Sequence, residues 1–499
     1  MSVLRQFSDA VPSSKDPTVQ RATTNAVDWA LAHGLVMKPA AAAIASAPST
    51  DVANHGGLAQ HAPFALFPTP FPKACFNQVV DLQPVLNQLF DRIARDHDFL
   101  ARCIESVVTV DEFTAQLYKV YQQTRAKPSS QSITLGLHRS DYLLHQPHDS
   151  NDLSIYQVEF NTISTSFAGL APVTTQLHRY LRENPAYAKL KAPQIAVHQT
   201  EGSLPNNTAT AYLVDGLAKA WQLYGCQSAV VVMAVQVGER NVFDQLRLTH
   251  DLRQRYGITM VRQTLAELRQ GAHLDPITQA LVLNGTEVAV VYYRTCYAPA
   301  DYASPADWET RLMVEQSKAI KAPTVAYQLA GTKKVQQVLT EPSVLERFIP
   351  NADDCDHVRA CFTGLYPLDN SPLGLDAVRR ALEAPEGYVM KPQREGGGNN
   401  VYGKDIPVFL QGLPVEEREA YILMDLIKPP VISNLLVHQG LAQKGEVISE
   451  LGIYGVWLSD HDHVYLNESA GHILRTKVAS SNEGGIAAGF GAIDSPALV

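Results

Sequence analysis

The sequence predicts a mixed α/β protein built from several units. Its 499 residues are enough for about three domain-sized units. A continuous apolar run at 229–235 is typical of a strand buried on both faces, and it is followed by a helical pattern at 243–256 and a further strand pattern at 258–261. Later in the chain, three segments are typical of antiparallel strands, namely residues 420–427, 446–458 and 463–467.

The composition excludes several classes of protein. Apolar residues make up 45% and charged residues 18%, which is ordinary for a globular protein. No stretch approaches the roughly 20 apolar residues of a membrane span, and residues 1–16 lack the apolar core of a secretory signal. A net charge of −9, without a basic run of five, argues against a nucleic-acid surface. We therefore expect neither a membrane nor a nucleic-acid partner.

Cysteine and histidine usage points to a cytoplasmic protein without a zinc site. The six cysteines contain no Cys-x-x-Cys pair, so we expect reduced thiols and no disulfide framework. The histidines lack the spacing of metal ligands.

Helical patterns alternate with strand patterns along the rest of the chain. We expect helices within 18–37, 76–125 and 171–225, and strands at 133–137 and 155–163. Residues 281–293 predict a hairpin, because Asn284-Gly285 separates two apolar runs. The segment 227–330 therefore predicts a compact α/β unit within the chain.

Residues 391–400, Lys-Pro-Gln-Arg-Glu-Gly-Gly-Gly-Asn-Asn, carry the most chemical information. Three glycines let backbone N–H groups approach an anion closely. Lys391 and Arg394 suit phosphate oxygens, and Glu395 suits Mg²⁺. Triple glycine alone would favour a surface turn, but the charged neighbours and the preceding strand pattern at 388–390 favour a nucleotide lid.

Two further groups of residues suggest oxygen ligands. Glu159 and Asn161 lie two apart on an expected strand, so both side chains share one face and, with Glu395, could hold Mg²⁺. An ordinary polar strand face is the alternative. Ser164, Thr165 and Ser166 follow at once, and they could bind a carboxylate or simply form a local hydroxyl-capped turn.

Several cations follow expected strands. Arg139 comes after the strand expected at 133–137, where it could bind a substrate carboxylate or form a surface ion pair. Arg294 and Tyr297 follow a buried run, at the strand end that ligands favour. Arg475 and Lys477 share a strand face and precede the glycine-rich segment 484–489, which could close over a small substrate.

Other motifs are excluded. Gly398, Gly403 and Lys404 approach a P-loop, but Asp405 replaces the hydroxyl residue that the motif needs. No Gly-x-Gly-x-x-Gly and no Gly-x-Ser-x-Gly occurs. The remaining set of cations, magnesium ligands and glycine loops fits phosphoryl transfer.

These motifs together resemble the eukaryotic-type glutathione synthetase family of ATP-grasp ligases. The matching segments occur in the family's order through almost the whole chain, at residues 135–142, 159–167, 239–245, 328–337, 391–403, 448–452, 474–477 and 484–489. The long glycine-loop motif is the most specific of them.

The resemblance implies a fold and a reaction. The fold is an ATP-grasp with an inserted parallel-sheet α/β substrate-binding domain and a glycine-rich lid. It implies three parts: residues 1–226 as the N-terminal part of the catalytic body, 227–331 as the substrate-binding domain, and 332–499 as the ATP-binding part with a lid at about 365–420. The reaction joins γ-glutamylcysteine to glycine with ATP, through an acyl phosphate. The family is usually a cytosolic homodimer that uses Mg²⁺, with two ions expected for each active site.

The resemblance also implies roles for individual residues. Arg139, Lys391 and Arg475 are the expected catalytic cations, and Glu159, Asn161 and Glu395 the expected magnesium ligands. The expected ATP contacts are Glu159, Lys333, Lys391, Glu395, Gly396, Gly397, Gly398, Asn399, Asn400, Tyr402, Met424, Asp425, Leu426, Ile427, Glu450, Lys477 and Glu483. The expected substrate contacts are Arg139, Ser164, Thr165, Ser166, Glu239, Asn241, Gln245, Arg294 and Tyr297 for the dipeptide, with Arg475, Ile486 and Ala487 for glycine.

Some positions depart from the family pattern and leave alternatives open. Asp425 and Leu426 stand where Glu and Lys are common, and Glu483 replaces a common Asp. Ala487-Ala488 suits glycine, whereas relatives that use β-alanine carry a bulkier Leu-Pro pair. A ligase that uses β-alanine, a non-catalytic nucleotide or thiol-peptide binder, and a kinase that releases the acyl phosphate are the alternatives.

Overall fold

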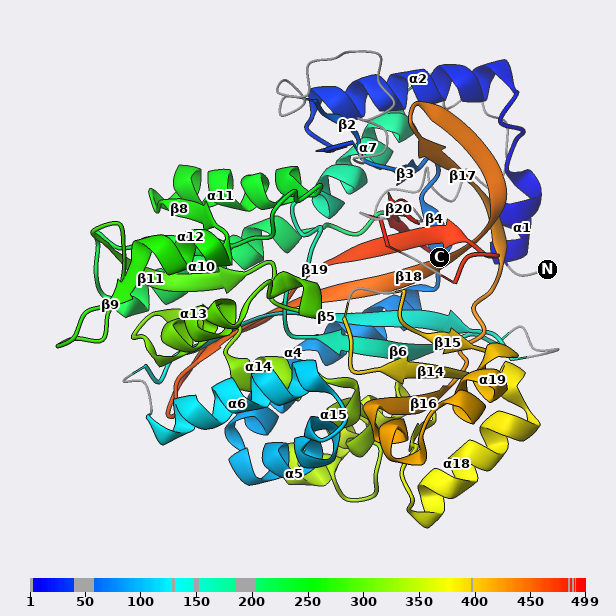
Figure 1. Cartoon of the computed structure of the whole chain (residues 1–499). Helices are drawn as coiled ribbons and strands as arrows, with labels where there is room; N and C mark the ends of the chain where they lie inside the picture. The colour runs from blue at the N-terminus through cyan, green and yellow to red at the C-terminus, as the bar shows by residue number, and fades with distance from the viewer. Residues whose placement is uncertain are drawn as a thin grey trace, which may run out of the picture.

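A seven-stranded sheet forms the centre of the molecule (Figure 1). The computed structural model describes residues 3–39, 58–127, 131–147, 152–184, 203–395, 398–482, 485–486, 489 and 491–499. Every strand pair of the central sheet is antiparallel except the short pairing of β20 with β3. Its strands in spatial order are β17 (Ile432–His438), β3 (Phe64–Ala65), β20 (Gly491–Asp494), β19 (Val464–Val478), β18 (Leu441–Ser459), β5 (Thr134–His145) and β6 (Ser154–Asn161).

The two faces of this sheet are covered by different helices. Side chains alternate along a strand, so β5 directs Leu135 and Leu137 to one face and Tyr142 and Leu144 to the other. The first face packs against α10 (Ala209–Tyr224) and the second against α4 (Lys73–Arg95). Further along β5, the face that carries Leu135 and Leu137 is no longer covered by α10, and the site described below is built there.

A second sheet lies beside the first and forms the left part of Figure 1. β8 (Met260–Gln263), β7 (Val230–Ala234), β11 (Thr286–Tyr293) and β12 (Ile320–Ala322) are parallel, whereas β10 (Leu281–Leu283) and β9 (Ala272–Leu274) add antiparallel pairs. The helices of this part are α11 (Val242–Tyr256), α12 (Leu265–Gly271) and α13 (Pro305–Gln316). The buried run at 229–235 thus forms a central strand of a mostly parallel sheet, as predicted.

A smaller four-stranded sheet faces the β6 edge of the central sheet (Figure 1). Its order is β13 (Leu365–Pro367), β16 (Tyr421–Asp425), β14 (Tyr388–Pro392) and β15 (Val401–Tyr402), all antiparallel. α18 (Pro372–Glu383) and α19 (Asp405–Gly412) pack on it around Met390 and Leu423. The glycine-rich segment connects β14 to β15.

The remaining elements surround these sheets. β1 (Val36–Met37) pairs with β2 (Gln60–His61), and β4 (Thr69–Phe71) pairs with β21 (Pro496–Leu498). The other helices are α1 (Val3–Ala10), α2 (Pro17–Ala32), α5 (His97–Val108), α6 (Glu112–Ala126), α7 (Ala171–Glu183), α14 (Val325–Ala330), α15 (Lys333–Val338), α16 (Leu345–Phe348) and α17 (Ala352–Ala360), with short 3-10 turns at Pro299–Asp301, Pro385–Gly387 and Val415–Ala420. In the described parts of the chain, no helix is both long and apolar enough to cross a membrane.

The structure confirms the predicted turn and helix end, whereas several strands are longer than predicted. The Asn284-Gly285 turn joins β10 to β11, and α11 ends at Gly257 in the left-handed conformation. The strand expected at 133–137 extends to His145, so Arg139 lies inside β5 and the prediction that it ends a strand is wrong. β18 and β19 are likewise longer than expected, because β18 pairs with β19 from Val447 to Ser459 and with β17 from Leu441 to Val447.

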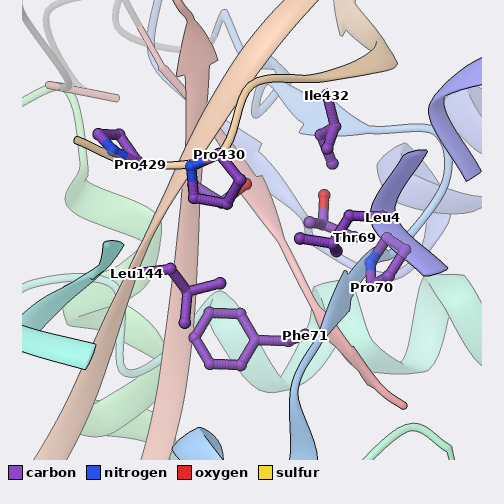
Figure 2. Close-up of a pocket in the computed structure, with 9 residues that line it drawn as sticks. Leu4, Thr69, Pro70, Phe71, Leu144, Pro429, Pro430 and Ile432 are labelled. Carbon is purple, nitrogen blue, oxygen red and sulfur yellow. The ribbon is translucent and has the colours of Figure 1, made fainter. Parts of the chain in front are cut away.

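A buried carboxylate ties the C-terminal strand to its neighbours. Asp494 accepts hydrogen bonds from the Thr69 and Thr476 hydroxyls, both at 2.7 Å, and from the backbone N–H groups of Thr69 and Ser495. Thr69 also lines a small cavity of about 20 Å³, which Figure 2 shows between Leu4 and Ile432 on one side and Leu144 on the other. Burial raises the pKa of Asp494 to about 6, although the four donors act in the opposite direction.

We expect Asp494→Asn to remove a pH dependence of stability. Below pH ~4 the carboxyl group is protonated in both states. Between pH ~4 and ~6 the unfolded state ionises first, so the wild type loses about 3 kcal/mol of unfolding free energy and then levels off. An asparagine can accept from both N–H groups and donate to both hydroxyls, so it should retain the native bonds. Chemical denaturation from pH 4 to 8 would measure the difference between the two proteins.

The exposed Asp9→Asn substitution in α1 controls for loss of a surface charge. The linkage would be contradicted if the unfolding free energies of the wild type and Asp494→Asn differed by the same amount at every pH in this range.

Candidate active site

Charged side chains gather on one face of the central sheet, beyond the part that α10 covers. The register places Asp141 opposite both Glu159 and Gly452, and it places Glu450 opposite Arg475. Because alternate residues of a strand share a face, the residues two positions away join the same surface. The set comprises Arg139 and Asp141 from β5, Glu159 and Asn161 from β6, Glu450 from β18, and Arg475 and Lys477 from β19.

Asp141 lies at the centre of this set, and the sequence did not single it out as a site residue. Its carboxylate accepts from Arg139 through Nε at 2.6 Å and Nη2 at 2.8 Å. It also accepts from Arg475 Nη2 at 2.8 Å and from Asn161 Nδ2 at 3.0 Å. The signal that could have found Asp141 is its position two residues after Arg139 on the same strand.

Lys333 lies between two of the expected magnesium ligands. Its ammonium group is 2.9 Å from Glu159 Oε2 and 2.9 Å from Glu395 Oε1, so the two carboxylates face one another across a single cation. Lys333 is 4% exposed at the start of α15, whereas the two carboxylates are each about a quarter exposed. The structure therefore brings Glu159, Glu395 and Lys333 together, from three segments distant in the sequence.

The two carboxyl groups differ in their acidity. Burial alone would raise the pKa of Glu159, but Lys333, Lys391 and Arg475 outweigh it and lower that pKa well below the usual range. Burial, with Glu159 adding to it against the effect of Lys333, raises the pKa of Glu395 to about 7. Glu159 is therefore the stronger acid of the pair, and Glu395 is the more easily protonated one.

These oxygens fit a divalent cation of the magnesium type. Each glutamate directs one oxygen to Lys333, which leaves its second oxygen for another cation, and Asn161 uses its amide nitrogen for Arg139 O and Asp141. No group of three or more His, Cys, Asp or Glu side chains gathers as a metal site within the described residues. Mg²⁺ needs only one or two carboxylates when phosphates and water supply the other ligands, so this donor set is sufficient.

Lys391 extends the site toward the glycine-rich segment. It lies in β14, is buried, and donates from Nζ to Val158 O at 3.0 Å. Burial lowers its pKa to about 8, with Lys333 adding to the shift and Glu159 and Glu450 opposing it. Arg394 does not join it, because its guanidinium pairs with Asp111 at the start of α6. The expected phosphate role of Arg394 is therefore not what this structure shows.

The glycine segment and its neighbours are only partly described. Gly396 and Gly397 lie outside the described residues. Gly398 has a positive φ of 77°, and Asn399 is exposed. Asn400 donates to the Tyr402 hydroxyl at 3.1 Å, which ties the end of the segment to β15.

An apolar cluster adjoins this segment, between the small sheet and β6. Met424 and Ile427 are buried in it with Leu365, Val389 and Ile422. Leu426 and Tyr402 pack at its edge, together with Val158 of β6. Asp425 turns away from the cluster, because its carboxylate accepts from Tyr366. The four expected nucleotide contacts at 424–427 therefore line an apolar wall with one polar edge.

The β19 end of the site contains the residues expected at the glycine substrate. Arg475 Nη2 contacts Glu450 as well as Asp141, and burial raises the pKa of Glu450 against the effect of Arg475. Lys477 donates to Asn482 O at 2.7 Å. Ile486 is buried, whereas Glu483 and Ala487 lie outside the described residues.

A second group of candidate residues lies at the carboxyl ends of β7 and β11. Arg294 is 3% exposed and donates from Nη2 to Asp244 at 2.9 Å. Asp244, which the sequence did not single out, also accepts from the N–H groups of Phe167 and Gly169, at 2.9 and 2.6 Å. Asp244 therefore holds Arg294 against the segment that follows β6. Its place directly before Gln245 was the available signal.

Several polar atoms of this group are buried without a partner among the described residues. They are Arg294 Nη1 and both side-chain atoms of Asn241. Glu239 accepts from the Asn241 N–H group at 2.6 Å and from Gln245 Nε2 at 3.3 Å. Tyr297 is half-buried beyond β11, and burial raises its pKa to about 12. Buried unpaired polar atoms are costly, so a polar ligand is the simplest partner for them.

The three hydroxyl residues after β6 connect the two groups. Ser164, in the left-handed region with φ 55°, donates weakly to Thr295 O at 3.3 Å, and Thr165 donates to Leu137 O at 3.1 Å. Ser166 O accepts from the Tyr454 hydroxyl at 2.6 Å. Ser164 and Thr165 bond to other strands, so a purely local turn does not describe them. The positive φ of Ser164 and of Phe167, at 71°, is typical of strained backbone at a functional site.

A further hollow lies away from these residues. It has a volume of about 460 Å³ and lies on the far side of α15, against Phe99 and Cys103 of α5 and Lys334 of α15. Of the cations that line it, Arg347 pairs with Asp96, and Lys334 donates a hydrogen bond to the neutral Gln337. The active-site assignment therefore depends on the side-chain constellation and not on cavity size.

The sheets and this constellation define a mixed α/β protein whose charged site lies on its central sheet. The solved apo structure of GSS30, a glutathione synthetase-like effector from Globodera pallida, shares the fold with a TM-score of 0.74, at 24% identity over 98% of this chain and 99% of that one. Residues 16–498 match the family described as eukaryotic glutathione synthase, ATP binding domain, and the chain belongs to this family.

Named relatives are similar over nearly their whole length. The chloroplastic glutathione synthetase of Solanum lycopersicum is 40% identical over 504 residues, which cover 99% of this chain and 88% of that protein. The glutathione synthetase of Homo sapiens is 38% identical over 474 residues, which cover 94% and 95% of the two chains.

We expect Gly452→Ala to disrupt this site. A Cβ atom at Gly452 would lie 2.7 Å from Asp141 Oδ1 and 2.8 Å from Arg139 Cδ, closer than real contacts allow. Such overpacking should cost about 1–3 kcal/mol and displace both charged side chains. Gly445→Ala in the same strand is the matched control, because its nearest neighbour would be Val478 Cγ1 at 3.8 Å. Thermal unfolding and ATP turnover would be measured for both variants. Equal unfolding temperatures and equal turnover rates for Gly452→Ala and Gly445→Ala would contradict this prediction.

Proposed function

We propose that this protein is a glutathione synthase, which uses ATP to join γ-glutamylcysteine to glycine. The proposal rests on one arrangement in a member of this family: Lys333 between Glu159 and Glu395, beside Lys391 and on the same sheet face as Arg139 and Arg475. That arrangement combines phosphate-binding cations, magnesium ligands and carboxylate-binding guanidiniums.

The chemistry has two steps. The cysteinyl carboxylate of the dipeptide attacks the γ-phosphate of ATP, which releases ADP and gives an acyl phosphate. The glycine amine then attacks the acyl carbon, and phosphate leaves as the amide bond forms. No enzyme group becomes covalently attached, so catalysis depends on positioning, charge stabilisation and exclusion of water.

We assign the ATP end to the small sheet and the β6 edge. Lys333 and Lys391 neutralise the phosphates, and the apolar wall around Met424 and Ile427 receives the adenine ring. Glu159, Glu395 and Asn161 would hold Mg²⁺, which supplies further neutralisation of the triphosphate when bound.

Charge balance supports two magnesium ions. The constellation contains five cations and four carboxylates: Arg139, Lys333, Lys391, Arg475 and Lys477 against Asp141, Glu159, Glu395 and Glu450. The site is thus close to neutral without substrates. ATP adds about four negative charges, and two divalent ions would offset them.

We assign the dipeptide to Arg139, the 164–166 segment and the residues at the ends of β7 and β11. The unpaired atoms of Arg294 and Asn241 support this assignment, because polar groups of the dipeptide could form hydrogen bonds with them. We place glycine at Arg475 and the segment that contains Ile486. The small Ala487-Ala488 pair supports glycine over β-alanine.

We also propose a domain division, an assembly and a compartment. Residues 227–331 would act as the substrate-binding domain between parts 1–226 and 332–499, and the sheet built within 230–322 supports this. The small sheet with its glycine segment would be the lid. A homodimer in the cytoplasm is our working assignment. The relatives in Solanum lycopersicum and Arabidopsis thaliana are named as chloroplastic, which makes a chloroplast the alternative compartment.

ADP release and product mass test the function directly. Purified protein would receive Mg-ATP and γ-glutamylcysteine, with glycine, β-alanine or no amine in parallel. Glycine-dependent turnover that yields glutathione is expected. Preference for β-alanine would replace the amine substrate, ADP release without any amine would indicate a kinase, and binding without turnover would indicate a binding protein.

We expect Glu395→Ala to reduce ADP formation by ~100-fold or more, because it removes a magnesium ligand and one partner of Lys333. Glu416→Ala, an exposed carboxylate on the same part of the chain, should leave the rate unchanged. Near-normal turnover by Glu395→Ala would remove Glu395 from the site.

A further inference from the structure

Asp141 brings the two arginines of the site into one hydrogen-bonded unit. Its side chain is fully buried, and both its oxygens are used. Oδ1 accepts from Arg139 Nε at 2.6 Å. Oδ2 accepts from Arg139 Nη2 and Arg475 Nη2, both at 2.8 Å, and from Asn161 Nδ2 at 3.0 Å. Four donors from three strands of the central sheet, β5, β6 and β19, therefore converge on one carboxylate.

We propose that Asp141 is a positioning residue for both substrates: by holding Arg139 and Arg475 together, it sets where the dipeptide carboxylate lies relative to the incoming glycine. The proposal rests on the function proposed above. It adds a residue that touches neither substrate in our assignment but controls two that do.

The first consequence concerns Arg139. Its Nε and Nη2 form a bidentate pair with Asp141, so the flat edge that usually grips a carboxylate is already occupied. Nη1 remains on the other side of the guanidinium, 3.5 Å from Ser166 O. Arg139 must therefore approach the dipeptide through Nη1, from a direction that Asp141 fixes.

The second consequence concerns Arg475. Its Nη2 is shared between Asp141 on β5 and Glu450 on β18. Two carboxylates thus hold Arg475 from both sides, one of them common to Arg139. Asp141 bonds to both arginines, so a movement of Arg139 when the dipeptide binds is transmitted to Arg475 through Asp141.

Electrostatics makes this unit cooperative. Two guanidiniums that converge on one carboxylate would repel each other without it, and the repulsion is strong where water is scarce. Removing one partner of a buried charged network leaves the others uncompensated. Gly452 lies opposite Asp141 and leaves the space that the unit needs.

The chain offers a matched control for this residue. Asp91 on α4 is 6% exposed and also pairs with an arginine, because Arg95 Nε lies 2.9 Å from each of its two oxygens. It further accepts from Tyr327 and Ser459, so it too has several donors. Asp91 contacts none of the residues assigned to substrates. Loss of either carboxylate disrupts a buried ion pair, but only one of the two pairs belongs to the site.

The test compares Asp141→Asn with Asp91→Asn by thermal unfolding and by steady-state kinetics. Both variants should lose stability. Asp141→Asn should raise KM for γ-glutamylcysteine and for glycine by about tenfold or more, and KM for ATP by less than about threefold. Asp91→Asn should leave all three KM values near those of the wild type. Equal changes in all three for Asp141→Asn would overturn the proposal and indicate a structural role.

A double-mutant cycle tests the coupling while Asp141 is intact, so it remains decisive if Asp141→Asn fails to fold. Arg139→Lys and Arg475→Lys should be non-additive in kcat/KM when Asp141 joins the two side chains, by about threefold or more. Additive effects would overturn the proposal.

Calorimetric binding of γ-glutamylcysteine without ATP separates this inference from the proposed function. Suppose that the wild-type protein binds the dipeptide but does not ligate it, and that Asp141→Asn binds it more weakly. This result would refute the proposed ligase function and retain the positioning role of Asp141. Unchanged binding to a folded Asp141→Asn, with active wild type, would refute the positioning role alone.

Discussion

The pairing of β18 with β5 on one side and β19 on the other is the constraint on which the rest of the site depends. Side chains alternate with a period of two, so the register decides which residues can meet. Glu450 faces Arg475 and Gly452 faces Asp141 because the three strands are aligned in this way. A shift by one residue would send all the charged side chains into the apolar layer that packs against α4. The core beneath the sheet thus fixes the site above it.

The fold could be predicted to a large extent, and for identifiable reasons. The run at 229–235 is apolar on both faces, and the Asn284-Gly285 turn has few alternatives, so both local predictions are confirmed. The length of β5 could not be predicted, because its polar middle, Arg139 to Asp141, is stabilised by partners from β6, β18 and β19. Nothing within the segment itself signals that these partners exist.

The candidate site, like the fold, could be predicted from the sequence only in part. The residues expected from the glycine motif and the strand pair do converge, since Lys333, Glu159 and Glu395 meet within hydrogen-bonding distance. Asp141 and Asp244 were missed, because each binds an arginine that only the tertiary fold brings close, Arg475 for Asp141 and Arg294 for Asp244. Arg394, whose charge suits phosphate oxygens, pairs instead with Asp111 at the start of α6. The spacing of charged residues in the sequence identifies candidate site residues. Their partners in the tertiary structure determine which of them join the site.

The cysteines have a consequence for a protein whose proposed substrate and product are thiols. Five of the six, Cys75, Cys103, Cys296, Cys355 and Cys361, are buried and unpaired. Burial raises the pKa of Cys103 and Cys296 to about 12 and that of Cys361 to about 11, so these sulfurs stay protonated at neutral pH. Thiol–disulfide exchange requires a thiolate with access to its target. The core is thereby insulated from mixed-disulfide formation in a pool of reactive sulfur, and Cys226 is the one cysteine of the six that is not buried.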